Sequence, residues 1–150
     1  MPKRFQASDT FKLLYSTQKH GYSISTLLRN SKEHKGPVIL GLRTENNSVL
    51  GAFATQPWAP HIGHFGTGEC FLFHEVDGQL ISYPTTGRNN YYLFCDGTFI
   101  AAGVSQGLFG LWIDSELATG SSSPVATFDN LPLASDGEQF RIHTVELWGI

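Results

Sequence analysis

One carboxylate in this chain is placed where a strand could hold it in a fixed position. Glu69 lies between Gly66 and Gly68 on one side and the apolar run 70–73 on the other. Glycine tolerates a positive φ and a close backbone approach, so the two glycines predict a turn that leads into a strand. The carboxylate could then serve a binding surface or, with the imidazole of His20, act as the acid/base pair of a hydrolytic enzyme.

A thiol follows Glu69 directly, which raises cysteine chemistry as another possibility. Cys70 as a nucleophile would need His64 or His20 as its base and Glu69 to orient that base. In a regular strand, however, Cys70 and Glu69 point to opposite faces. Direct scavenging of peroxide by Cys70 or Cys95 requires an exposed thiol with a lowered pKa, whereas free cysteines are mostly buried. We therefore predict that both cysteines are structural.

Two histidines lie in the tetrapeptide HIGH at 61–64, which also occurs in class I aminoacyl-tRNA synthetases. In those enzymes it belongs to a parallel, doubly wound sheet, which a mostly antiparallel domain does not offer. The same histidines, with Cys70 and His74, could be imagined as zinc ligands. Cys70 and His74 would lie about 13 Å apart in an extended strand, unlike the close-spaced ligand pairs of structural zinc sites. We predict no metal site and no cofactor.

Composition disfavours several classes of protein. The 150 residues are 41% hydrophobic and 15% charged, which is typical of one globular domain with a single core. A net charge of −3 leaves no excess of positive charge for phosphate backbones, so a nucleic-acid binder is disfavoured. Two cysteines, no signal-peptide pattern and no apolar run of 18 residues predict a cytoplasmic protein without membrane insertion. We expect a monomer.

Turn residues divide the chain into many short strands and one clear helix. Ser23 can cap a helix that continues to about Asn30, with its apolar residues on one face. Asp77-Gly78 and Asp96-Gly97 each predict a two-residue hairpin turn of type I′, because both central positions of that turn require a positive φ. Consecutive hairpins of this kind predict antiparallel sheet.

The C-terminal half adds three expectations. Residues 108–113 are almost continuously apolar, which is typical of a central strand buried on both faces. The serine-rich stretch 120–124 is expected to be an exposed loop, and a change of apolar phase near His143-Thr144 predicts a β-bulge in the last strand. The fold class is therefore α+β but mainly β: two packed antiparallel sheets, a β-sandwich, with one or a few short helices at the edges.

The order of motifs along the chain resembles the TLDc domain, the module of the eukaryotic oxidation-resistance proteins. The resemblance runs from about Leu13 to Gly149 and rests on LYSTQKHGYS at 14–23, GAF at 51–53, GTGECFLF at 66–73, TGRN at 86–89, FGLWID at 109–114, TFDN at 127–130 and VELWG at 145–149. It implies the same sandwich architecture, with an N-terminal arm over 1–12 and a single domain over 13–150.

The resemblance implies a non-catalytic interaction module with a role in protection against oxidative stress. Its implied protein partner is the vacuolar proton-pumping ATPase, through which a cytoplasmic chain could reach vacuolar, lysosomal or mitochondrial surfaces. The binding residues that it implies are His20, Ser23, Gly66, Gly68, Glu69, Asn89, Asp114 and Glu146. Each of these also has a structural reading, such as a helix cap, a turn or a satisfied buried group. The alternative function is a hydrolase-like enzyme that uses Glu69 with His20.

Overall fold

Antiparallel strands form most of the regular structure in residues 11–150, the part of the chain that this computed structural model describes. The N-terminal arm expected over 1–12 lies almost entirely outside the described residues. In chain order the elements are β1 (Lys12–Ser16), α2 (Thr17–His20), α3 (Ile24–Lys32), β2 (Val38–Thr44), β3 (Val49–Ala54), β4 (Phe71–Val76), β5 (Gln79–Pro84), β6 (Leu93–Cys95), β7 (Ile100–Ser105), β8 (Leu108–Ile113), β9 (Thr119–Ser121) and β10 (Gln139–Gly149).

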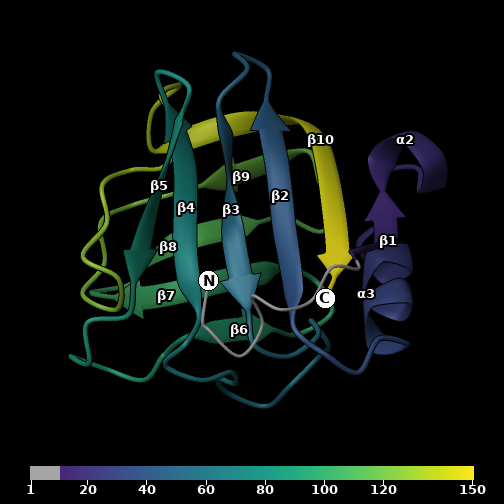
Figure 1. Cartoon of the computed structure of the whole chain (residues 1–150), viewed down its shortest axis with the longest axis horizontal. Helices are drawn as coiled ribbons and strands as arrows, with labels where there is room; N and C mark the ends of the chain where they lie inside the picture. The colour runs from purple at the N-terminus through teal and green to yellow at the C-terminus, as the bar shows by residue number, and fades with distance from the viewer. Residues whose placement is uncertain (1–10) are drawn as a thin grey trace.

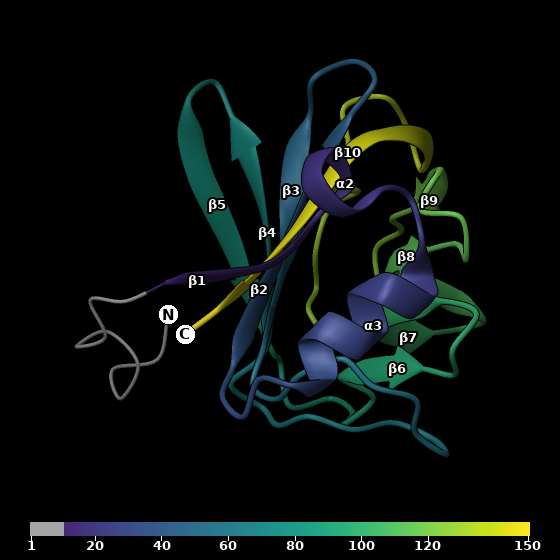
Figure 2. The ribbon, with the colours of Figure 1, turned by 90° about the vertical axis from the view of Figure 1, so that its right-hand side faces the viewer.

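Two sheets face each other, and β10 takes part in both (Figures 1 and 2). The first sheet has the order β5-β4-β3-β2-β10-β1, and the second has the order β6-β7-β8-β9-β10. The first residues of β10, 139–141, pair with β9, whereas the rest of the strand pairs with β2 and β1. The predicted β-sandwich is confirmed, and one long strand joins its two layers.

Apolar side chains from both sheets fill the space between the layers. Leu40 and Leu72 from the first sheet and Leu93 and Leu111 from the second are almost fully buried in one continuous core. Helix α3 packs on β1 and β10 at the side of the sandwich, where Figure 2 shows it between the layers. In residues 11–150 neither helix is long and apolar enough to cross a membrane.

The bulge predicted in the last strand is confirmed. The register between β10 and β2 shifts between Ile142 and Thr144. The backbone N–H of Val145, just beyond the shift, donates to the hydroxyl oxygen of Thr17 at 3.2 Å. Because Thr17 begins α2, the bulge is tied to a short helix that the sequence did not indicate.

One of the two hairpin predictions is confirmed and the other is wrong. Asp77 and Gly78 have φ values of 51° and 80°, and Val76 pairs with Gln79. At the second site Cys95 pairs with Ile100, so the loop has four residues. The Asp96 carboxylate accepts from both the backbone N–H and the hydroxyl of Thr98, at 2.9 and 2.6 Å. This side-chain turn replaces the type I′ turn.

Two predictions about exposure in the C-terminal half are also wrong. Leu108 begins β8 with 50% of its surface exposed, so this strand is not buried on both faces along its length. The stretch 120–124 begins within β9, and its Ser122 is fully buried. The Ser122 hydroxyl donates to Gly110 O at 2.6 Å and accepts from Leu133 N at 3.0 Å, which makes burial of this polar group favourable.

Candidate functional site

The eight residues implied as binding residues fall into three separate places in the fold. His20, Ser23 and Glu146 lie where α2 and α3 meet β10, Gly66, Gly68 and Glu69 lie in the turn before β4, and Asn89 and Asp114 lie beside strands of the second sheet. These residues therefore do not form one continuous surface.

The first group is built on the pairing of β1 with β10. Ser16, at the end of β1, lies opposite Glu146 of β10. The backbone N–H of Ser16 donates to Nδ1 of His20 at 3.0 Å, and the His20 ring stacks on Tyr15 with 5.5 Å between ring centroids. Because Nδ1 is the acceptor, the neutral imidazole carries its proton on Nε2. His20 thus holds α2 against the end of β1, where Ser16 pairs with Glu146 of β10.

Tyr15 and Ser23 connect α2 to α3. The buried Tyr15 hydroxyl donates to the carbonyl of Gly21 and accepts from the backbone N–H of Ser23 at 3.2 Å. The Ser23 hydroxyl then accepts from Thr26 N at 3.3 Å, as the predicted helix cap requires. The family-pattern residues His20 and Ser23 are therefore occupied in fixing the two helices.

Beside these helices lies a shallow polar cavity of about 300 Å³. We call its lining the α2–β10 surface, and it consists of Ser16, Gln18, Arg43, Asn47, His143, Thr144 and Glu146. Arg43 and Glu146 are exposed, so the surface offers one positive and one negative side chain. The backbone carbonyl of His143 accepts from the Tyr22 hydroxyl at 2.6 Å, which fixes the rim of the cavity to the segment between the helices.

The second group is the turn before β4, where the two glycines differ. Gly66 has a φ of 88°, and a Cβ added to it would lie 2.7 Å from Cδ1 of Leu93. Gly68 does not have a positive φ, and a Cβ there would meet only ordinary contacts, the nearest being the Tyr92 hydroxyl oxygen at 3.4 Å. The positive φ expected from the sequence is thus present at Gly66 and absent at Gly68.

Threonine hydroxyls hold the backbone of this turn. The Thr55 hydroxyl oxygen accepts from Thr67 N at 3.1 Å, and the Thr85 hydroxyl donates to Gly68 O at 2.6 Å. The backbone N–H of Glu69 donates to the Thr67 hydroxyl oxygen at 3.3 Å. The position of Glu69 at the start of β4 is therefore fixed through its main chain.

The structure does not bring His20 and Glu69 together. Glu69 immediately precedes β4 and His20 ends the helix that follows β1, and β3, β2 and β10 lie between those two strands. Four strand spacings of about 4.8 Å place β1 roughly 19 Å from β4. The acid/base pair of the hydrolase alternative would need hydrogen-bond reach, which this arrangement does not provide.

Asn89 and Asp114 use their side chains to hold loops. The Asn89 amide donates to Val104 O at 3.3 Å, and its oxygen accepts from Tyr91 N at 3.0 Å and from the Thr127 hydroxyl at 2.9 Å. The Asp114 carboxylate accepts from Ala118 N at 2.9 Å. These bonds match the structural readings of the two residues.

Asp114 makes a testable contribution to stability. Burial by itself raises the pKa of this carboxyl, but hydrogen bonds from the Thr119 hydroxyl and the Ala118 backbone outweigh it and lower the pKa. A carboxyl whose pKa is lowered by folding stabilises the folded state at pH values above its pKa in the unfolded chain. This stabilisation is lost as the pH falls through the pKa of the folded state. We expect Asp114→Asn to be less stable than wild type at neutral pH in urea unfolding. The difference should shrink towards about pH 3; a constant difference would refute this assignment.

Both cysteines are buried, with 1% of the surface of Cys70 and 2% of that of Cys95 exposed. Burial raises the pKa of the Cys95 thiol, which opposes formation of a reactive thiolate. The sulfur of Cys70 lies 3.6 Å from the Thr55 hydroxyl oxygen, inside the support of the Gly66 turn. The two thiols are therefore part of the packing and not part of an exposed reactive site.

His61, His64 and His74 form aromatic or structural contacts. His61 stacks on Phe65 with 4.1 Å between centroids, and His64 packs edge-on against Tyr91. His74 is buried, and both of its ring nitrogens have partners: Nδ1 donates to Leu133 O at 3.0 Å and Nε2 lies 3.0 Å from the Tyr83 hydroxyl. Within residues 11–150 no three His, Cys, Asp or Glu side chains are grouped as metal ligands.

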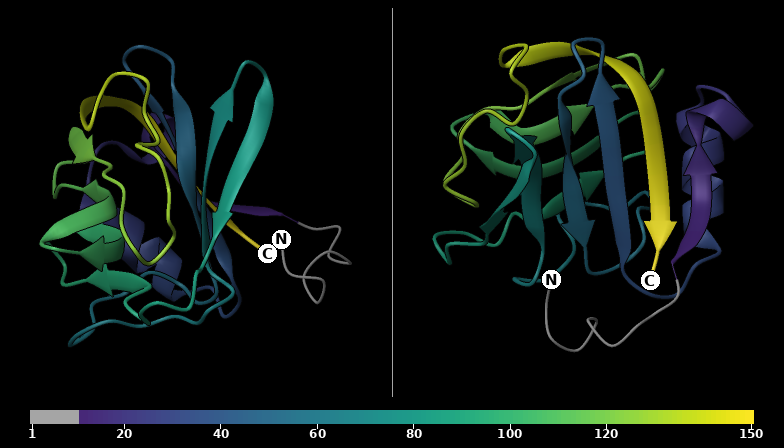
Figure 3. Two further views of the ribbon diagram at one scale, coloured as in Figure 1. Left: turned by 90° about the vertical axis from the view of Figure 1, so that its left-hand side faces the viewer. Right: turned by 45° about the horizontal axis from the view of Figure 1, so that its top comes forward.

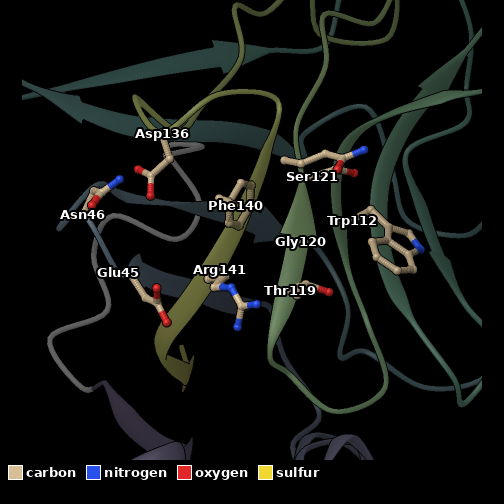
Figure 4. Close-up of a pocket in the computed structure, with 10 residues that line it drawn as sticks. Glu45, Asn46, Trp112, Thr119, Gly120, Ser121, Asp136, Phe140 and Arg141 are labelled. Atoms are coloured by element: carbon tan, nitrogen blue, oxygen red, sulfur yellow. The ribbon is translucent and has the colours of Figure 1, made fainter.

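A cavity of about 640 Å³ lies where β10 passes from one sheet to the other (Figure 4). Figure 4 shows Glu45, Asn46 and Asp136 on one side and Trp112 on the other. Oδ1 of Asp136 accepts from the Thr44 hydroxyl at 2.9 Å, so this carboxylate supports the end of β2. Most of the lining residues lie outside the motifs that carried the resemblance, so no local pattern indicates this cavity.

Comparisons with known proteins agree with the motif pattern. The model of the TLDc domain family matches residues 1–150. Oxidation resistance protein 1 of Yarrowia lipolytica is 33% identical over the whole chain, which covers 68% of that protein. Nuclear receptor coactivator 7 is 36% identical in Gallus gallus and 34% identical in Homo sapiens, over 99% of this chain but only 16% and 15% of those proteins. The chain belongs to the TLDc domain family.

Proposed function

We propose that this chain is a TLDc-type interaction module that contributes to protection against oxidative stress by binding a protein, without catalysis of its own. Relatives that carry the name oxidation resistance protein support the oxidative-stress role. The burial of both thiols is the observation that carries the non-catalytic part, because peroxide would have to reach a sulfur that the fold covers. Protection then depends on what the surface binds.

The proposed contact surface is the α2–β10 surface. His20 and Ser23 belong to the family motifs and fix the helices beside this surface, while Glu146, from the last motif, is exposed on it. Residues held by a rigid scaffold and presented to solvent are suited to specific recognition. Exposed Arg43 and Glu146 would pair with groups of opposite charge on the partner, which favours orientation and a high association rate.

The proposed partner is the vacuolar proton-pumping ATPase, which a cytoplasmic chain would meet at its cytosolic sector. This proposal comes from the family resemblance, and the mixed charge of the α2–β10 surface is compatible with a protein partner. A binding role for Glu69, at the far end of the first sheet, stays a prediction that Glu69→Gln would test. The hydrolase alternative has no supporting observation, because Glu69 and His20 are held apart.

A variant without thiols tests the non-catalytic mechanism. Cys70→Ala/Cys95→Ala should protect cells against peroxide as well as wild type does, after correction for the amount of folded protein. Both substitutions remove buried atoms, so a cost of about 1–2 kcal/mol is expected and thermal unfolding must confirm that the variant is folded. A folded variant that has lost its protection would contradict the proposal and point to thiol chemistry.

A further inference from the structure

Strand β5 forms an outer edge of the first sheet. It pairs with β4 alone in the part of the chain that the structure describes, and the pairing runs without a break from Phe71 with Pro84 to Val76 with Gln79. Leu80 is 66% exposed and Ile81 is 38% exposed, on opposite faces of the strand. Figure 3 shows the hairpin of β4 and β5 leaning away from the second sheet, so its edge is accessible.

The two other sheet edges within residues 11–150 are protected. β1 carries a charged residue, Lys12, and α3 packs on it. β6 has only three residues, and Leu93 in it exchanges two backbone hydrogen bonds with Phe65, at 2.9 and 3.1 Å. Charges, short length and covering segments are the usual means by which proteins prevent pairing of exposed edges.

β5 has almost none of these protections. Its sequence, QLISYP over 79–84, contains no charged residue, no bulge interrupts it, and only Pro84 at its end lacks a backbone donor. Two copies of this strand would therefore meet without like-charge repulsion, whereas a charged partner strand would find no complementary charge on it. An antiparallel strand can also pair with a copy of itself about a two-fold axis, which closes the assembly at a dimer.

We propose that β5 is a self-association surface, through which a second copy of this chain pairs edge to edge to continue the first sheet across a two-fold axis. Side chains stay on their own face when the axis passes through a residue, and registers centred on Ile81 or Ser82 pair the most residues of the strand. In either register the two Ser82 side chains are opposite or diagonal neighbours, within about 8 Å of each other. A contact of six residues per chain is small, so the proposed dimer is transient. It would replace the monomer that the sequence led us to expect.

Charge variants at Ser82 test this pairing, because Ser82 is exposed and its substitution leaves the core intact. Sedimentation equilibrium at low ionic strength would compare wild type, Ser82→Lys, Ser82→Glu and an equimolar mixture of the two variants. The wild-type average mass should rise towards the dimer as its concentration approaches about 1 mM. Each variant alone should associate at least tenfold more weakly, and the mixture should regain association because opposite charges then meet.

The matched control is Ser25→Lys, which adds the same charge at an exposed position of α3 and should associate as wild type does. A wild-type chain that stays monomeric up to about 1 mM would overturn the proposal. The edge of β5 would then be available only for pairing with a strand of another protein. Wild-type association that Ser82→Lys leaves unchanged would also overturn it, because the dimer would then use a different surface.

Discussion

Gly66→Ala is expected to lower the free energy of unfolding by about 3 kcal/mol, the largest effect of any substitution in the expected binding residues. Two costs add. A residue with a Cβ at a φ of 88° is strained by about 1–3 kcal/mol, and the new atom would lie 2.7 Å from Cδ1 and 2.9 Å from Cγ of the buried Leu93. In a chain of this length the midpoint of thermal unfolding should fall by roughly 6–12 °C.

Gly68→Ala is the matched control for that experiment. Gly68 does not have a positive φ, and the closest atom to an added Cβ is the Tyr92 hydroxyl oxygen at 3.4 Å. The stability of this variant should stay within about 0.5 kcal/mol of wild type. Equal destabilisation by the two substitutions would contradict the difference in backbone conformation on which the prediction rests.

Asn89→Ala is expected to cost about 2–3 kcal/mol of stability, the second of the large effects. The substitution removes partners from Val104 O, Tyr91 N and the hydroxyl of Thr127, and Thr127 is fully buried. As a donor, the Thr127 hydroxyl then keeps only its longer contact with Val104 O, at 3.3 Å, and Tyr91 N loses its side-chain acceptor, so part of the cost of desolvation remains. Urea unfolding would measure the loss.

Asn90→Ala serves as the control for Asn89, since Asn90 is exposed and contributes a backbone carbonyl to Tyr92 N that alanine retains. This variant should be within about 0.5 kcal/mol of wild type. If Asn89→Ala were as stable as Asn90→Ala, the hydrogen bonds of Asn89 would be dispensable, and its presence in the family motif would favour a binding role instead.

Local signals in the sequence predicted several elements correctly, because their causes are local. The helix cap needs only the Ser23 hydroxyl and the backbone N–H of Thr26, three residues later. The hairpin at Asp77-Gly78 needs only the two residues of the turn. The bulge in β10 was visible as a change in the apolar phase of a single strand. The number of short strands and the turn residues between them were enough to predict a sandwich of antiparallel sheets.

The division of the expected site could not be predicted, because it depends on contacts between distant residues. His20 and Glu69 lie in two motifs of the same family pattern, yet the strand order separates them. Leu93 leaves no room for a side chain at Gly66, and the hydroxyl of buried Ser122 bonds with Gly110 and Leu133. None of these partners is marked by a local pattern.

The most direct test of the proposed function is capture of the purified cytosolic sector of the vacuolar ATPase by wild type, Glu146→Lys and Glu138→Lys. Both glutamates are exposed, but Glu138 precedes β10 and does not line the α2–β10 surface, so it controls for the change of charge. Wild type and Glu138→Lys should capture the complex equally, and Glu146→Lys should bind at least tenfold more weakly, a difference of about 1.4 kcal/mol. No capture by folded wild type, or equal capture by all three chains, would contradict the proposal.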